Sequence, residues 1–133
     1  MADLDAVRFQ LLAQALCLTT DRQAVLDALK GAGVDAIQVS SHGARQLESA
    51  PAAIEVLAKI RTDLGPDFPL FYDSGIRSGE DVLKALSLGA DFVFIGRILQ
   101  YAIAVAGERG LEQLWDTLSE ELSIAMAQTG RTS

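Results

Sequence analysis

Short apolar runs alternate with stretches of helical periodicity along most of the chain. Three such runs end at polar or glycine-rich clusters and occupy residues 36–39, 69–72 and 92–95. Runs this brief are typical of buried parallel strands rather than of helices. Between them, apolar side chains recur every three or four positions, which indicates amphipathic helices. The pattern therefore predicts an α/β fold in which strand and helix alternate.

Start signals frame three helices between the apolar runs. Thr20 and Gln23 have the spacing of a capping box, which predicts that a first helix begins there. A second helix is expected from about Ser49, with Pro51 in its first turn. Ser78 has the side chain of a helix N-cap and predicts the start of a third. The apolar faces of the three helices are expected to contain, in chain order, Val25, Leu26 and Leu29; Ile54, Leu57 and Ile60; and Val82, Leu83 and Leu86.

The two ends of the chain differ in the clarity of their pattern. Residues 110–129 have apolar side chains at helical spacing and predict a long amphipathic helix, in which Trp115 is expected to pack. Acidic residues there, including Glu121, are expected to face solvent. The segment before residue 19 is ambiguous, and we expect a helix over 4–12 followed by a strand over 15–18.

Alternating strands and helices imply parallel strands joined by right-handed crossovers. The segments 33–37 and 89–93 repeat one pattern, namely a glycine, a small residue, an aspartate and then a strand. Each strand ends at a polar or glycine-rich cluster, on the face where (β/α) barrels place their active sites. With no linker or low-complexity tract, we expect one domain over residues 1–133.

Composition narrows the classes of partner. The formal net charge of −7 argues against a nucleic-acid partner, so an anionic ligand must be held by a few well-placed cations. Because Cys17 is the only cysteine, an internal disulfide is excluded. Its side chain is expected to be a buried small hydrophobe. No apolar run approaches the ~20 residues of a membrane span, and we expect a cytoplasmic protein without a transmembrane segment. No spacing of His, Cys, Asp or Glu suggests a metal site.

Two strand ends have the features of a phosphate site. The segment 73–77 offers backbone N–H groups near a helix start, the flexible Gly75 and the guanidinium of Arg77. Gly96 and Arg97 repeat this arrangement after the next strand. Either pair alone could be a turn glycine beside a solvated arginine. Their occurrence at successive strand ends favours a phosphate site, because the last two strands of a barrel commonly hold one.

An earlier strand end contains His42 and, three residues later, Arg45. Histidine is the side chain best suited to take a proton near neutral pH, and arginine can bind a carboxylate through paired donors. The pair could orient and deprotonate a small hydroxy acid beside a cofactor. The alternative is a surface histidine in a glycine turn, next to a solvated arginine.

These clusters resemble those of a known family. Residues 40–46, Ser-Ser-His-Gly-Ala-Arg-Gln, resemble the signature Ser-Asn-His-Gly-(Ala/Gly)-Arg-Gln of the FMN-dependent 2-hydroxy-acid dehydrogenases and oxidases, which act on lactate, glycolate or mandelate. Residues 73–79 and 89–97 resemble the family's FMN-phosphate segments, and the similarity runs from about Thr19 to the end. The resemblance implies the carboxy-terminal half of a TIM (β/α)8 barrel with a long C-terminal helix.

The resemblance also implies a role for each site residue. His42 would bind the substrate and remove the proton of its 2-hydroxyl group while hydrogen leaves C2 for flavin N5, and Arg45 would bind the substrate carboxylate. Ser40 would touch the flavin. The residues implied to hold the ribityl phosphate of FMN are Asp73, Ser74, Gly75, Arg77, Gly96 and Arg97.

The chain departs from the family at three places. Ser41 replaces an asparagine of the signature, and no lysine lies near Ala15, where the family has one on the preceding strand. The segments that form the first half of the barrel and cover the flavin ring have no counterpart. Because three or four parallel strands leave two unpaired edges, we expect the chain to form a homo-oligomer or to pair with a chain resembling the missing half.

Three functions fit these observations. The first is an FMN-dependent oxidoreductase, as fragment or subunit, that converts a small L-2-hydroxy acid to the 2-oxo acid. The second is another barrel with the same phosphate grip, such as a relative of inosine-monophosphate dehydrogenase; these lack the signature around His42 and use a catalytic cysteine, for which Cys17 is badly placed. The third is a non-catalytic half-barrel assembly or an FMN- or phosphate-binding module.

Overall fold

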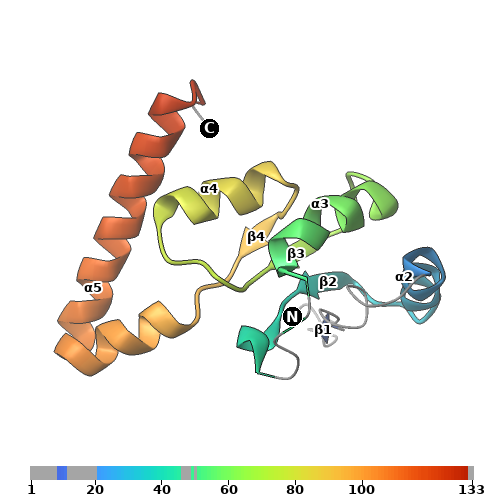
Figure 1. Ribbon diagram of the computed structural model, residues 1–133, viewed down its shortest axis with the longest axis horizontal. Coiled ribbons are helices and arrows are strands. Elements are labelled where there is room, and N and C mark those ends of the chain that lie inside the picture. Colours follow the sequence, from blue (N-terminus) through green and yellow to red (C-terminus); the bar gives the residue numbers. More distant parts are fainter. Residues whose placement is uncertain (1–8, 12–20, 46–48, 50, 132–133) are drawn as a thin grey trace, which may run out of the picture.

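The computed structural model describes residues 9–11, 21–45, 49 and 51–131. Within these residues the strands form one four-stranded parallel sheet, in the order β1-β2-β3-β4 (Figure 1). The strands are β1 (Phe9–Leu11), β2 (Ala36–Val39), β3 (Leu70–Tyr72) and β4 (Phe92–Val93). The predicted parallel sheet is therefore confirmed. The strand over 36–39 is also confirmed at both ends, whereas those predicted over 69–72 and 92–95 are shorter.

Helices connect the strands in the predicted alternation. They are α2 (Arg22–Gly31), the 3₁₀ turn η1 (His42–Ala44), α3 (Ala53–Leu64), α4 (Gly79–Ser87) and α5 (Arg97–Gln128). Ser78 caps α4 as predicted, since its side chain accepts a hydrogen bond from the Asp81 backbone. The N-cap of α2 is Asp21 rather than Thr20, because the Asp21 carboxylate accepts from the backbone of Ala24. The second helix begins at Ala53, later than the predicted start near Ser49.

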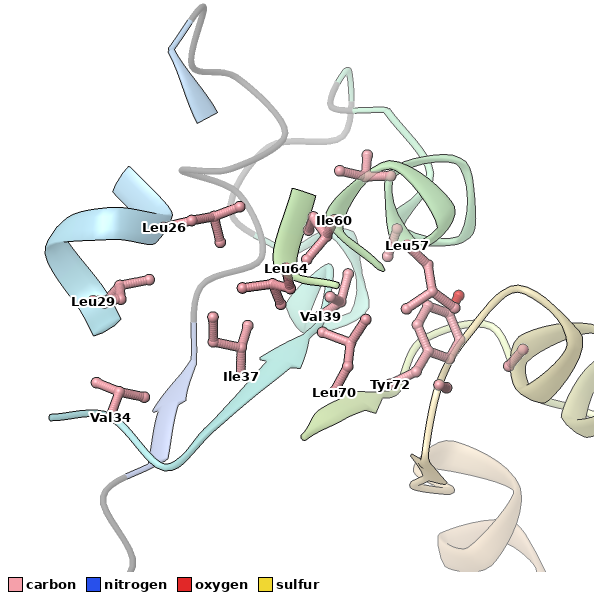
Figure 2. Close-up of a cluster of buried hydrophobic side chains, with 14 of the residues drawn as sticks. Leu26, Leu29, Val34, Ile37, Val39, Leu57, Ile60, Leu64, Leu70 and Tyr72 are labelled. Carbon is pink, nitrogen blue, oxygen red and sulfur yellow. The ribbon is translucent and has the colours of Figure 1, made fainter. Parts of the chain in front are cut away.

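One face of the sheet carries the hydrophobic core. Side chains of a strand alternate between faces, so Ile37 and Val39 lie on the same side as Leu70 and Tyr72. Helices α2 and α3 cover this side with fully buried leucines and an isoleucine: Leu26, Leu57 and Ile60 (Figure 2). Full burial of each large apolar side chain stabilises the fold by about 1.5–3 kcal/mol.

The other face of the sheet is open and aromatic. Gln38 and Phe71 are Cα partners on this face, and the ring of Phe71 lies edge-on to those of Phe92 and Phe94. Phe92 is 54 % exposed and Phe94 is 39 % exposed. The prediction of a fully buried strand over 92–95 is therefore wrong. Strand alternation turns both rings away from α2 and α3, so they remain partly exposed beside Phe71.

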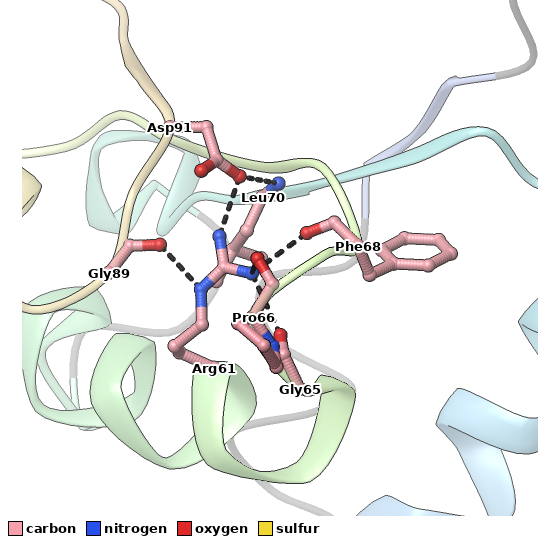
Figure 3. Close-up of polar contacts among 7 residues, drawn as sticks. All are labelled: Arg61, Gly65, Pro66, Phe68, Leu70, Gly89 and Asp91. Carbon is pink, nitrogen blue, oxygen red and sulfur yellow. Dashed lines mark hydrogen bonds and ion pairs between the residues drawn. The ribbon is translucent and has the colours of Figure 1, made fainter.

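Arg61 joins α3 to the starts of β3 and β4 (Figure 3). Its Nη2 lies 2.6 Å from the Asp91 carboxylate, which also accepts from the backbone of Leu70. The other guanidinium nitrogens donate to backbone carbonyl oxygens, namely those of Gly65, Pro66, Phe68 and Gly89. The Arg61 side chain is only 16 % exposed, so most of its charge-assisted bonds are shielded from solvent, whereas the Asp91 side chain is 51 % exposed. Asp91, from the repeated pattern, thus fixes the end of the sheet opposite to the polar clusters.

The C-terminal helix differs from its prediction over 110–129. It begins at Arg97 and bends at Ala106 and Gly107, whose backbone angles are not helical. The buried positions of the last segment are small or sparse, with Leu118 and Ala125 facing inward. Trp115 is 68 % exposed, so the prediction that it packs is wrong. The helix touches the domain along a stripe narrower than its apolar sequence pattern implies.

Helix α5 reaches back to the first turn of α4. The Gly79 N–H donates to the Glu121 carboxylate over 2.8 Å, so the prediction that Glu121 is simply solvated is wrong. A carboxylate is favourable at this place because the N-terminus of a helix carries partial positive charge. Within α4, Ala85 is fully buried whereas Leu86 is 39 % exposed, which corrects the predicted apolar face.

The remaining predictions concern the N-terminal segment. Leu11 belongs to strand β1, so the helix predicted over 4–12 is wrong at its end. The strand predicted over 15–18, Cys17 within it, and Thr20 lie outside the described residues. In the part of the chain that the structure describes, no helix has both the length and the apolar character needed to cross a membrane.

Gly79→Ala tests the contact between α4 and α5. A Cβ at this position would lie 2.2 Å from the Leu122 backbone nitrogen and 2.6 Å from the Leu118 carbonyl oxygen. We expect the free energy of unfolding to fall by about 1–3 kcal/mol, measured by urea denaturation, because backbone atoms cannot move aside as a side chain can. Gly31→Ala is the matched control, since a Cβ there meets nothing within 4 Å. Equal stability of the two variants would contradict the close approach.

Candidate functional site

The carboxyl ends of β2, β3 and β4 surround one cavity of about 480 Å³. Parallel pairing brings these strand ends to the same edge of the sheet. All nine site residues predicted from the sequence line this cavity: Ser40, His42, Arg45, Asp73, Ser74, Gly75, Arg77, Gly96 and Arg97. Its volume lies in the range of small-molecule and cofactor sites, about 300–1,000 Å³. The structure therefore brings the three clusters together, as one binding site requires.

The end of β2 turns sharply at His42. Backbone φ is +50° at His42 and +60° at Ala44, in the left-handed region that residues other than glycine rarely adopt. Ser40 is 2 % exposed, and its hydroxyl accepts from the His42 N–H over 3.1 Å. This bond holds a turn that would otherwise be costly, because each such residue is strained by about 1–3 kcal/mol.

The His42 imidazole has one ring nitrogen, Nδ1, that is buried and has no hydrogen-bond partner among the described residues. A buried polar atom without a partner costs free energy, so it marks a place where a ligand or water would bind. Arg45 lies at the rim, where its Nε donates to the His42 carbonyl oxygen over 3.1 Å. The rest of the exposed guanidinium faces the same cavity.

The end of β3 forms the turn that leads into α4. Ser74 has φ of +94° and Gly75 has φ of +78°. A Cβ on Gly75 would meet nothing within 4 Å, so the backbone at this point borders open space in which an anion could approach it. Arg77 follows, and its backbone N–H donates to the Asp81 carboxylate. The turn thus presents backbone and one guanidinium to the cavity.

The end of β4 supplies a second helix start. The N-cap residue of α5 is Gly96, which has no side chain. The first N–H groups of α5 therefore have no side-chain acceptor from the N-cap residue. A Cβ on Gly96 would meet nothing within 4 Å. Arg97 is the first residue of the helix and also lines the cavity. Helix N-termini of this kind attract anions through their N–H groups and their dipole.

Two neighbouring residues were not identified from the sequence. Gln38, on the open face of β2, donates from its side-chain amide to Asp73 Oδ2. The Tyr72 hydroxyl donates to the Ser74 carbonyl oxygen over 2.8 Å. A signal for Gln38 was present, since it is the single polar residue of its strand. Tyr72 gave none, because it reads as one more apolar position of β3.

The site fits a phosphate ester with a longer polar body. Arg77 and Arg97 come from two strand ends to one cavity that also contains the start of α5 and Gly75. These donors suit the three oxygens of a phosphate group. His42 and Ser40 lie on the wall supplied by the end of β2, towards which the remainder of such a ligand could extend.

Tyr72→Phe tests the effect of burying the Tyr72 hydroxyl. Burial, with smaller contributions from Asp73 and Asp81, raises the pKa of the Tyr72 hydroxyl to about 12 from its usual value of 10.0. The neutral form is therefore favoured by the fold, and its contribution to stability is present below about pH 10 and lost as pH rises towards 12. We expect the wild type to lose stability over this window more steeply than Tyr72→Phe, measured by urea denaturation at a series of pH values. Parallel pH profiles would exclude the effect.

Three comparisons relate the chain to known proteins. The family model described as FMN-dependent dehydrogenase matches residues 17–133. L-lactate oxidase of Alicycliphilus denitrificans is 48 % identical over 102 residues, which is 77 % of this chain and 28 % of that protein. The 2-hydroxyacid oxidase 1 of Homo sapiens is 46 % identical over 98 residues, 74 % of this chain and 26 % of that protein.

Solved structures agree with the sequence matches. Mandelate oxidase, crystallised with 3,3-difluoro-2-hydroxy-3-phenylpropionic acid, superposes with a TM-score of 0.82 at 37 % identity, covering 96 % of this chain and 36 % of that one. The monotopic membrane protein (S)-mandelate dehydrogenase gives 0.77 at 34 % identity, covering 92 % and 30 %. The predicted fold, part of a TIM barrel, is confirmed by these superpositions.

The matched region sets the scope of the likeness. The chain spans about a quarter to a third of the length of the curated relatives that it matches. The family match nevertheless covers most of the chain, including all three strand ends around the cavity. This chain therefore belongs to the FMN-dependent dehydrogenase family.

Proposed function

We propose that the cavity binds FMN and that this chain supplies the phosphate grip and the base for oxidation of a small L-2-hydroxy acid to the 2-oxo acid. The observation that carries the proposal is the convergence of nine residues from three strand ends on one cavity. The related oxidases named above, which act on 2-hydroxy acids by name, support the substrate class.

The phosphate would be held between the ends of β3 and β4. Arg77 and Arg97 provide the cations, and backbone N–H donors come from the turn around Gly75 and from the start of α5 after Gly96. Asp73 and Ser74 shape the turn that carries Gly75. Because the whole chain has a net charge of −7, these few cations are needed to offset a field that repels anions.

The flavin and the substrate would lie towards β2. Ser40, in the wall of the cavity, would touch the flavin, and Arg45 at the rim would bind the substrate carboxylate through paired donors. His42 would accept the proton of the 2-hydroxyl group. The electron pair of the broken O–H bond would then form the carbonyl bond of the product. When bound, FMN supplies an acceptor at N5 for the hydrogen and the electron pair that leave C2.

A second function is favoured by the open aromatic face. Four strands are half the number that closes a barrel, and the free edges of the sheet and the rings of Phe92 and Phe94 need a cover. We therefore also propose that the chain forms a homo-oligomer or pairs with a chain that resembles the missing half. In the non-catalytic alternative, such an assembly binds FMN or a phosphate without turnover.

His42→Ala tests the catalytic role. The full chain should take up FMN and reduce it when lactate or glycolate is added, as followed by flavin absorbance. We expect His42→Ala to bind FMN within about threefold of the wild type but to reduce it at least about 100-fold more slowly, because a positioned base contributes 10²–10⁴-fold. Glu112→Gln, an exposed change on α5, is the control. FMN binding without reduction by the wild type would favour the non-catalytic module, and absence of binding would reject both.

Phe92→Lys tests the proposed assembly. At micromolar concentration, light scattering should give a mass at least twice that of one chain, because burying an exposed aromatic face against a second chain is favourable. Phe92→Lys should shift the mass towards that of a monomer. Trp115→Lys is the matched control, since Trp115 is an exposed aromatic residue on α5 rather than on the sheet. A stable wild-type monomer would reject self-association.

A further inference from the structure

Gln38 is a polar residue on a sheet face whose other residues on β2, β3 and β4 are apolar, among them Phe71 and Phe92. It lies on the open side of β2, with Phe71 as its Cα partner on β3. Polar groups in such surroundings are costly unless they form hydrogen bonds. The Gln38 side-chain amide meets this need by donating to Asp73 Oδ2, one residue beyond the end of β3. This bond links the body of β2 to the start of the turn that carries Ser74 and Gly75.

A chain of three hydrogen bonds leads from Gln38 to the residue before His42. Asp73 accepts from Gln38 on Oδ2 and from the Ser74 hydroxyl on Oδ1, the latter over 2.7 Å. The Ser74 hydroxyl oxygen in turn accepts from the Ser41 N–H over 2.8 Å. The first and last members belong to the same strand and its following turn. The chain therefore forms a loop between the ends of β2 and β3.

Each hydrogen bond in this chain depends on the donor and acceptor roles of its neighbours. A serine hydroxyl has one proton to donate, and Ser74 gives it to Asp73, which leaves the oxygen lone pairs for the Ser41 N–H. Gln38 holds the second carboxylate oxygen and so fixes the plane of Asp73. Loss of the amide would let the carboxylate rotate and weaken the acceptor geometry at Ser74. The effect would reach the backbone just before His42.

We propose that Gln38 is a positioning residue that acts through Asp73 and Ser74 to hold the His42 turn at the edge of the cavity. The strained turn needs such support, because φ is positive at both His42 and Ala44. The proposal rests on the proposed function only for the role of His42 in catalysis. The hydrogen-bonded chain itself belongs to the protein without ligand and is measured there.

The position of His42 can be followed by NMR, because it is the only histidine in the chain. The imidazole proton resonances in the NMR spectrum of the ligand-free full chain therefore need no assignment. We expect Gln38→Leu to displace or broaden them relative to the wild type at the same pH. Gln23→Leu is the matched control, since Gln23 donates to Asp27 over 2.8 Å on the exposed surface of α2. Unchanged His42 resonances in Gln38→Leu would overturn the proposal.

Gln38→Glu adds a readout that a purely structural role would not move. The introduced carboxyl can donate to Asp73 only while protonated, and two ionised carboxylates at this distance repel each other. We expect the variant to match the wild type near pH 5 and to match Gln38→Leu near pH 8, with each comparison made at equal pH. If Gln38→Leu fails to fold, the displacement of Gln38→Glu from the wild type, expected near pH 8 and absent near pH 5, decides alone. Identical displacement at both pH values would overturn the proposal.

Ser74→Gly tests the path of the effect. Glycine suits the φ of +94° at this position, so the variant removes the hydroxyl without adding strain. It should displace the His42 resonances as Gln38→Leu does, and the double variant should show no further displacement, because both changes interrupt one chain of bonds. Additive displacements would show that Gln38 acts by another route and would overturn the proposal.

The flavin-loaded chain separates positioning from binding. We expect Gln38→Leu to slow flavin reduction by about tenfold or more, as loss of a hydrogen bond to a charged group does, while the dissociation constant for FMN rises by a smaller factor. Equal losses in both would count against positioning of His42. If the wild type takes up no FMN, the proposed function fails, and the resonances of the ligand-free chain still decide the role of Gln38.

Discussion

The register between β2, β3 and β4 is the constraint on which the cavity depends. The Asp73 N–H donates to the Val39 carbonyl oxygen, and the Phe94 N–H donates to that of Tyr72. These bonds place three strand ends at one level, so that side chains more than fifty residues apart in sequence line one space. A slip of one residue would turn every side chain of a strand to the opposite face of the sheet. It would bury Gln38 in the core and remove the strand's polar end from the cavity.

Stability and binding are separated along the strands. At one end, Arg61 and Asp91 join α3 to the starts of β3 and β4 through an ion pair and part-buried hydrogen bonds. At the other end, His42, Ala44 and Ser74 occupy left-handed backbone conformations that cost free energy. The fixed end and the buried core allow the strained end to persist. Strain at the cavity is thus offset by contacts that no ligand touches.

The sequence contained most of this arrangement. Glycine and arginine after short apolar runs predicted where polar clusters would gather, because the ends of parallel strands meet at one edge of their sheet. The structure confirms that gathering, while the roles assigned to His42 and Arg45 stay predictions. Exposure was harder to foresee. Phe92 and Trp115 have the pattern of buried residues, but burial depends on whether another element covers them, and no local pattern encodes that.

Hydrogen bonds between distant segments escaped sequence reasoning for a related reason. Gln38 is the single polar residue of its strand, but its partner Asp73 lies 35 positions away. Glu121 has the neighbours of a solvated helix face, yet it accepts from Gly79 across 42 positions. Such pairs depend on the packing of whole elements. Neither residue type nor spacing announces them.

The bond between Glu121 and Gly79 couples the C-terminal helix α5 to the first turn of α4. Gly79 is the first residue of α4, two positions after Arg77 at the rim of the cavity. Shortening the chain before Glu121, or fusing a bulky tag that levers α5 outward, would release the first turn of α4 and with it the guanidinium nearest to that turn. The last turns of α5 therefore brace the edge of the sheet that borders the cavity, even though Glu121 does not line the cavity.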